Sequence, residues 1–287
     1  MTFLTSPIEW WIDPFSDAFM REVLALGLLL VLATSVVGTW VVLRGMSFLG
    51  DALAHGVVPG IAIAFVLGTS TTVGALIAAL AMVSGVSLIR THSPLPEDTS
   101  IGVLFVGFLA LGVVVISSHT ESYAGDLTRF LFGSVSGVTS DDLVRQAAAA
   151  AIAVGGVIVF YRAFLVLTFD EAQAQLLGLR PRLAHAVLLG LLAITIVASF
   201  QTVGSLLVFA FLVAPPATAA MLVKRVPLVM ATAVVIGSAA VLVGLLVSFH
   251  HETATGATMS LVAVVIFLVA LIARAGRQAM VGHIRNL

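Results

Sequence analysis

Long apolar segments follow one another along this chain and decide what it can fold into. There are about nine, each of roughly 17–25 residues, which is the length a helix needs to cross about 30 Å of hydrocarbon. Only 9% of the 287 residues are charged, whereas a soluble domain carries about 25%. Inside a bilayer every backbone polar group needs an internal partner, which helices provide. The sequence therefore predicts an all-α, polytopic helical membrane protein with about eight or nine transmembrane helices.

The expected spans fill residues 19–275, which we treat as one transmembrane domain. We place them at Phe19–Leu43, Phe48–Leu67, Thr72–Ile89, Ser100–Ser118, Leu143–Tyr161, Ala184–Phe200, Ser205–Val223, Val226–Phe249 and Ala257–Ala273. The pair Pro215–Pro216 lies inside the seventh span, and because proline lacks a backbone N–H we expect a short or broken helix there. Residues 1–18 form an interfacial N-terminal segment with Trp10 and Trp11 as anchors, and residues 276–287 form a tail.

Positive charge is divided unequally between the two ends of these spans. In a nine-span arrangement, ten of the 13 Lys and Arg residues fall on one side, and only Arg21, Arg129 and Arg145 fall on the other. Cytoplasmic loops carry an excess of Lys and Arg in membrane proteins. We therefore expect the C-terminal tail to be cytoplasmic and residues 1–18 to be extracytoplasmic.

Several kinds of chemistry are excluded by the residues that the sequence lacks. It has no cysteine, so neither disulfides nor thiolate metal ligands can form. Its one lysine, Lys224, follows Val223, so the G-x-x-x-x-G-K-[ST] nucleotide loop cannot occur. The sequence contains no H-E-x-x-H, no G-x-S-x-G and no run of basic residues. We therefore expect no enzymatic activity, no resident cofactor and no nucleic-acid partner.

The stretch GDALAHGVVPGIAIA carries the acid and the imidazole that lie deepest in the apolar sequence. Of 14 acids only Asp51, and of seven histidines only His55, fall well inside an expected span. An acid at the centre of a membrane helix costs about 2.5–3.5 kcal/mol on insertion scales, which makes it a functional candidate by default. Residues four apart share one helix face, and Pro59 deprives the carbonyl of His55 of its helical partner. Carboxylate, imidazole and carbonyl together suit Mn²⁺, Fe²⁺ or Zn²⁺.

Two side chains do not complete a coordination shell, so the remaining ligands would come from another helix, from water or from a second copy of the chain. Three other interpretations stay open. The pair could be a hydrogen-bonded staple between helices. It could be a proton or cation relay in a secondary transporter. It could also belong to an intramembrane metalloenzyme, although a third ligand and a general base are missing nearby.

A polar segment interrupts the apolar pattern between two spans on the cytoplasmic side. The loop covers about residues 162–183 and contains the run FDEAQAQLLGL, Phe169–Leu179. We expect a short helix from Asp170 to Leu177, because Asp170 suits an N-cap and Gly178 suits a C-terminal stop. From composition alone, this loop could equally be a solvated connector.

Several motifs in one order resemble the membrane permease subunits of ABC importers for manganese, zinc and iron. The likeness begins at DPFSDAFMREVLALGLLL and continues through VVLRGMSFLGDALAHGVVPGIAIAF, which is similar to the most recognisable stretch of that family. It resumes at LPEDTSIGVLFVGFLALGVVVIS and LTRFLFGSVSGVTSDDL. It ends with VGSLLVFAFLVAPPATAAMLVKR and TGATMSLVAVVIFLVALIAR. The resemblance therefore extends over nearly the whole chain.

The resemblance implies a cobalamin-type (type II) ABC importer permease fold for residues 19–275, in a bacterial plasma membrane. It implies a homodimer, two cytoplasmic ABC ATPase subunits and an extracytoplasmic metal-binding protein. Asp51 and His55 would line the pore at the dimer axis and contact the divalent metal ion, which is the transported substrate. Asp170, Glu171, Leu176 and Gly178 would couple the permease to the ATPase.

One group departs from the pattern expected for this family. His250, His251 and Glu252 lie at the extracytoplasmic end of a span, where they could form an outer contact for the ion or simply a solvated loop. Within the family, a permease for a metal chelate is a further alternative, although such a pore does not require an acid beside an imidazole.

Overall fold

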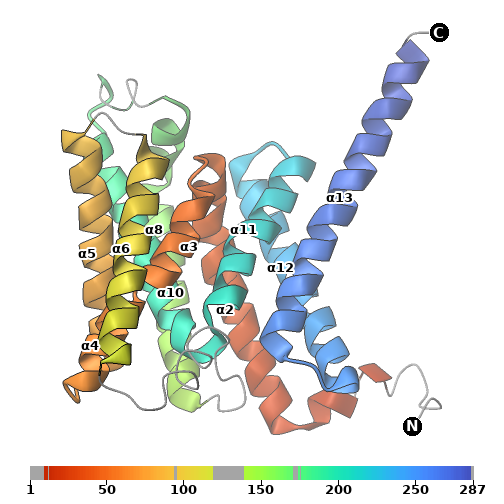
Figure 1. Ribbon diagram of the computed structural model, residues 1–287. Coiled ribbons are helices and arrows are strands. Elements are labelled where there is room, and N and C mark those ends of the chain that lie inside the picture. The colour runs from red at the N-terminus through yellow and green to blue at the C-terminus, as the bar shows by residue number, and fades with distance from the viewer. Residues whose placement is uncertain are drawn as a thin grey trace.

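The computed structural model describes residues 10–11, 13–93, 96–118, 139–170, 174 and 176–285. All regular structure in these residues is helical (Figure 1). The elements are η1 (Asp13–Ser16), α2 (Ala18–Leu43), α3 (Ser47–Gly56), α4 (Val58–Val66), α5 (Thr71–His92), α6 (Glu97–Ser117), α8 (Ser140–Phe169), α10 (Pro181–Val203), α11 (Ser205–Leu222), α12 (Val226–His251) and α13 (Thr255–Arg285).

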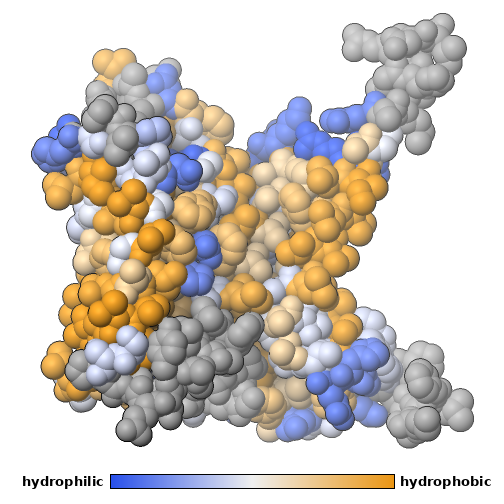
Figure 2. All heavy atoms as spheres, viewed as in Figure 1, coloured by the Kyte–Doolittle hydropathy of each residue, from blue (hydrophilic) through white to orange (hydrophobic). Residues whose placement is uncertain are grey.

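Nine stretches of the described residues are long and apolar enough to cross a membrane, with α3 and α4 together forming one of them. This confirms the predicted all-α, polytopic architecture. An odd number of spans places the chain ends on opposite sides, and Figure 1 shows the N- and C-terminal ends at opposite ends of the bundle. The space-filling view shows an apolar surface between two more hydrophilic ends, and a hollow in this face (Figure 2).

Helix α2 is the central helix of the bundle and packs against α8, α11 and α12. Its side chains include Leu30, Val37 and Trp40, all fully buried. The indole of Trp40 meets the rings of Tyr161 and Phe164 of α8 edge to face, with ring centroids 5.6 Å apart in both cases. Edge-to-face contacts of this kind add to the gain from burial alone. Aromatic packing therefore fixes α8 against the central helix.

Helix α11 is continuous, in contrast to the short or broken helix expected around Pro215–Pro216. The two prolines lie inside Ser205–Leu222. Pro216 cannot donate to the carbonyl of Leu212, and that carbonyl lies directly against Gly38 of α2. A glycine there lets two backbones approach closely, and Cα–H···O contacts recur at such interfaces. Packing against α2, α12 and α13 holds the helix together despite the missing hydrogen bonds.

Two helices extend beyond their expected ends. Helix α8 continues to Phe169, so residues 162–169 of the expected cytoplasmic loop are helical, and the connection to α10 spans only residues 170–180. Helix α13 continues to Arg285, so most of the expected tail at 276–287 is a helix that projects beyond the bundle (Figure 1). The extension of α8, RAFLVLTF, is apolar apart from Arg162 and Thr168 and is compatible with a longer span, whereas the extension of α13 is polar and hydropathy does not mark it.

Candidate functional site

Asp51 and His55 lie on a short helix that is bounded at each end by an interruption of the helical backbone. Helix α2 ends at Leu43, the turn contains Gly45 at φ 69°, and α3 begins at Ser47. Helix α3 ends at Gly56, and α4 starts with Pro59 in its first turn. Pro59 was expected to leave the carbonyl of His55 without a helical partner. In the structure it follows the end of α3, which lies at Gly56, one residue after His55. Both side chains consequently lie beside a backbone break inside a span.

The turn before α3 is fastened to a distant helix. The guanidinium Nη1 of Arg44 lies 3.0 Å from Nδ1 of His185 in α10. Because arginine can only donate, the Nδ1 atom of His185 accepts this hydrogen bond. The contact ties the start of α3 to α10 and so helps to hold Asp51 in position.

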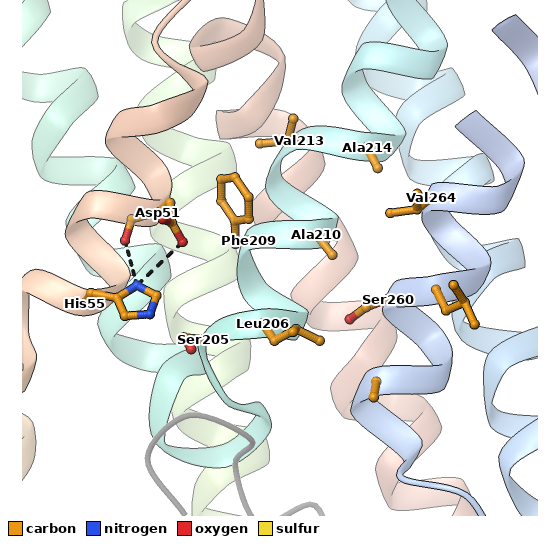
Figure 3. A pocket seen from close by; sticks show the side chains of 12 residues that line it. Asp51, His55, Ser205, Leu206, Phe209, Ala210, Val213, Ala214, Ser260 and Val264 are labelled. Carbon is orange, nitrogen blue, oxygen red and sulfur yellow. Dashed lines mark hydrogen bonds and ion pairs between the residues drawn. The ribbon is translucent and has the colours of Figure 1, made fainter. Parts of the chain in front are cut away.

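The structure brings the two predicted metal ligands together. His55 Nδ1 lies 3.5 Å from Oδ1 of Asp51 and 3.1 Å from the backbone carbonyl oxygen of Asp51 (Figure 3). A carbonyl oxygen only accepts, so Nδ1 carries the proton and Nε2 of the neutral ring keeps its lone pair. Histidine ligands commonly bind metal with one nitrogen while the other donates to a carbonyl in this way. The ring of Phe105 in α6 meets His55 edge to face at 5.7 Å and restricts its orientation.

The pair faces a cavity of about 670 Å³ between α3, α11 and α13. Its lining residues are Asp51, His55, Ser205, Leu206, Phe209, Ala210, Val213, Ala214, Ala257, Ser260, Leu261 and Val264, and Figure 3 shows Ser260 across the cavity from His55. Among the lining residues that the structure describes, the carboxylate and the imidazole are the only ionisable groups. An otherwise apolar cavity with two convergent polar groups is the usual form of a small-ligand site.

Two serines of this lining were not predicted from the sequence. Ser205 begins α11, and Ser260 lies on α13, where its hydroxyl donates to the carbonyl of Gly256 at 2.8 Å. Serines are common in transmembrane helices, so neither stands out in the sequence. Only the packing of α11 against α3 and of α13 against α11 brings them to the cavity.

One chain offers an incomplete metal site in the part that the structure describes. Within those residues no group of three or more His, Cys, Asp or Glu side chains is placed to hold a metal ion. The side chains of His55 and Asp51 remain 21% and 29% exposed, so both can reach a partner outside the chain. The geometry therefore suits two ligands of a shared or hydrated ion.

The residues considered as an outer contact are not gathered into a site. The ring of His250 stacks on Trp10 at 4.5 Å, and its Nε2 donates to the carbonyl of Trp10 at 3.1 Å. His251 is exposed, and Glu252 ends α12 in the left-handed conformation at φ 50°. His250 thus fastens the N-terminal segment to the end of α12, which gives it a structural role.

The polar segment after α8 has the expected helical stop. Asp170 ends α8, and its carbonyl accepts from the N–H of Ala174 at 3.1 Å. Gly178 has φ 68°, and the N–H of Leu179 donates to the carbonyl of Ala174 at 3.0 Å, as in a glycine-terminated helix. Leu176 is 87% exposed, more than any other large apolar side chain that the structure describes. Glu171 lies outside the described residues.

Comparisons with known proteins show the family to which the chain belongs. The sequence model of the ABC 3 transport family matches residues 16–274. This chain belongs to the ABC 3 transport family. A manganese transport system membrane protein, MntC, of Listeria innocua is 36% identical over 254 residues, covering 88% of this chain and 90% of the relative. A probable iron transport system membrane protein of Haemophilus influenzae is 36% identical over 265 residues, covering 92% and 96%.

A solved structure shows the same fold in this family. It is PsaBC from Streptococcus pneumoniae in complex with Fab, which aligns with a TM-score of 0.81 and 30% identity over 92% of this chain and 95% of that chain. The ABC 3 chain thus has the type II importer fold. It is a multi-pass, non-catalytic membrane permease subunit of an ABC transporter.

Proposed function

We propose that the chain is the transmembrane subunit of an ATP-driven importer of divalent transition metal ions, through a pore lined by Asp51 and His55. The observation that carries this proposal is the meeting of a carboxylate and an oriented imidazole at an otherwise apolar cavity. The printed names of the relatives, a manganese system and an iron system, support the same class of substrate.

Two copies of the chain complete the site in this proposal. A single copy supplies one carboxylate and one imidazole, and most metal sites use four to six ligands. A second copy across a two-fold axis would double these donors, because a symmetric interface places the same residues on both sides. Two facing carboxylates repel each other unless a cation lies between them, which favours closure around one ion.

The need to release the ion favours manganese or iron over zinc as cargo. A carboxylate and an imidazole can bind Mn²⁺, Fe²⁺ or Zn²⁺, and zinc binds more tightly than manganese or iron at almost any nitrogen and oxygen site. A transport site must release its ion, and tight binding slows release. We therefore expect Mn²⁺ and Fe²⁺ to be carried faster than Zn²⁺.

Energy enters through partner ATPases at the segment of Asp170, Glu171, Leu176 and Gly178. The exposed Leu176 beside a fixed helical stop offers an apolar contact on a rigid support. An extracytoplasmic metal-binding protein delivers the ion at the opposite face, near the N-terminal segment.

Uptake into proteoliposomes tests this function directly. The permease is reconstituted with its ATPase and binding protein, and ⁵⁴Mn²⁺ uptake is measured with ATP, without ATP, and with an imposed pH gradient in place of ATP. The proposal requires uptake that depends on ATP and on the ATPase. Uptake driven by the pH gradient without the ATPase would show the secondary transporter instead.

A substitution at Gly178 tests the coupling segment separately. Gly178→Ala places a side chain at φ 68°, a conformation that costs an L-residue roughly 1–2 kcal/mol. We expect ATP hydrolysis to lose its stimulation by the loaded binding protein, while metal binding at Asp51 is retained. Gly155→Ala, where a new methyl group meets nothing within 4 Å, serves as the control. Normal stimulation in Gly178→Ala would contradict this role.

A further inference from the structure

A cluster of four basic side chains lies at one end of α11, α12 and α13, away from the metal site. Lys224 and Arg225 form the turn between α11 and α12, and Arg274 and Arg277 lie one turn apart near the end of α13. All four are exposed. In Figure 2 hydrophilic residues gather beside α13 at this end of the bundle.

A hydrogen bond joins the two parts of the cluster. Nη1 of Arg274 donates to the carbonyl of Met221 at 3.0 Å, so its guanidinium is held beside the α11–α12 turn. Lys224 follows three residues after Met221 in a connection of only three residues, which gives it little freedom to move away. The four cations are thus gathered by the fold and do not form a flexible tail.

The second part of the sequence contains almost no acidic side chain that could neutralise these four cations. Between residues 172 and 287 the only acid is Glu252, which lies at the opposite end of α12. Among the residues that the structure describes, no ion pair neutralises these four cations, and clustered cations create a positive potential that attracts anions. The positive-inside rule explains why these residues are cytoplasmic, but it does not require them to converge on one point.

Exposed apolar side chains begin immediately next to the cations. Leu222 is 56% exposed and Leu228 51% exposed, on either side of the turn, and on α13 Ile272 is 70% exposed. The surface therefore has a group of cations that can bind an anion, and exposed apolar side chains begin within one or two helical turns of these cations. This combination matches an amphiphile with a phosphate headgroup and acyl chains.

We propose that Lys224, Arg225, Arg274 and Arg277 form a binding site for an anionic phospholipid of the cytoplasmic leaflet. Its phosphate is held at the α11–α12 turn, and its acyl chains lie along α13. Basic clusters next to transmembrane helices attract anionic lipid headgroups. Because α11 and α13 also line the cavity of Asp51 and His55, a lipid bound here supports the wall of that cavity.

Spin-labelled lipids test this site on the full chain. The chain is reconstituted in phosphatidylcholine vesicles with spin-labelled phosphatidylglycerol or phosphatidylcholine as probe, and the motionally restricted fraction is measured by EPR. We expect a preference for phosphatidylglycerol of about tenfold. Each cation near the surface raises the affinity for an anionic lipid about fivefold, and screening by salt lowers the combined effect of the four cations. The preference should fall at high salt and approach one in the variant Lys224→Gln/Arg225→Gln/Arg274→Gln/Arg277→Gln.

Two further variants separate charge from folding and from position. Arg225→Lys/Arg274→Lys/Arg277→Lys retains all four charges and should keep the preference. Arg21→Gln/Arg145→Gln removes two cations from the opposite side and should also keep it. Equal retention of the two probes by the unaltered chain, at low salt, would overturn the proposal. The proposal would also be overturned if the fourfold variant kept the preference but no longer bound the ATPase. That result would show that the cluster binds an acidic protein surface.

Discussion

Asp51→Asn and His55→Ala are expected to lower ATP-driven Mn²⁺ uptake by more than about tenfold each, while ATP hydrolysis and assembly with the partners survive. Asparagine has the shape of aspartate but lacks the charge that attracts the ion, and alanine removes the imidazole whose Nδ1 is fixed by the carbonyl of Asp51 at 3.1 Å. Loss of a group that only orients a metal ligand commonly costs 10–100-fold, and loss of a ligand itself is expected to cost at least as much. Initial rates of ⁵⁴Mn²⁺ uptake in proteoliposomes measure the effect.

Asp98→Asn is the matched control for the loss of an acid. Asp98 is exposed in the first turn of α6, outside the cavity of Asp51 and His55, so its variant should transport normally. Equal ATPase rates and equal melting temperatures show that the variants differ only at the site. If Asp51→Asn and His55→Ala transport like the unaltered chain, the pair is a structural staple between helices.

Gly38→Ala is expected to cause a large loss of stability. A methyl group at Gly38 would overlap the carbonyl oxygen of Leu212 and approach Cγ of Pro216 at 3.2 Å. These atoms belong to a backbone and a ring, neither of which can rotate away, so α2 and α11 must separate. Overpacking of flexible core side chains costs about 1–3 kcal/mol, and we expect at least about 3 kcal/mol here. Thermal unfolding of the purified chain measures the change.

Gly155→Ala in α8 provides the comparison, because its methyl group would meet nothing within 4 Å. Its stability should stay within about 1 kcal/mol of the unaltered chain, the size of the difference in helix propensity. A Gly38→Ala chain as stable as Gly155→Ala would show that α2 and α11 do not pack as closely as described.

Hydropathy is sufficient to predict the spans because membrane helices must be long and apolar. It fails where the environment changes. Helix α13 continues to Arg285, beyond its apolar stretch, and the continuity of α11 through Pro215 and Pro216 depends on helices packed around it. The continuity of α11 arises from tertiary contacts, which a single apolar pattern does not contain, whereas the end of α13 is polar and hydropathy alone does not mark it as helical.

The residues of the candidate site were likewise predictable only in part from the sequence. Asp51 and His55 are recognisable because an acid and an imidazole inside an apolar span are rare and four residues apart. Ser205 and Ser260 are ordinary residues in their own helices, and they join the site only because α11 and α13 pack near α3. The role of His250 was also hidden, since its partner Trp10 lies 240 positions away in the sequence.

Counting the imidazoles on one bound ion tests the central claim most directly. Mn²⁺ is added to the reconstituted transporter under conditions that close the permease, and pulsed EPR measures the ¹⁴N couplings of the bound ion. Shared binding by two copies predicts one Mn²⁺ per two chains with two equivalent imidazole nitrogens, both lost in His55→Ala. A spectrum without imidazole couplings, or one that is unchanged in His55→Ala, would contradict a metal pathway through Asp51 and His55.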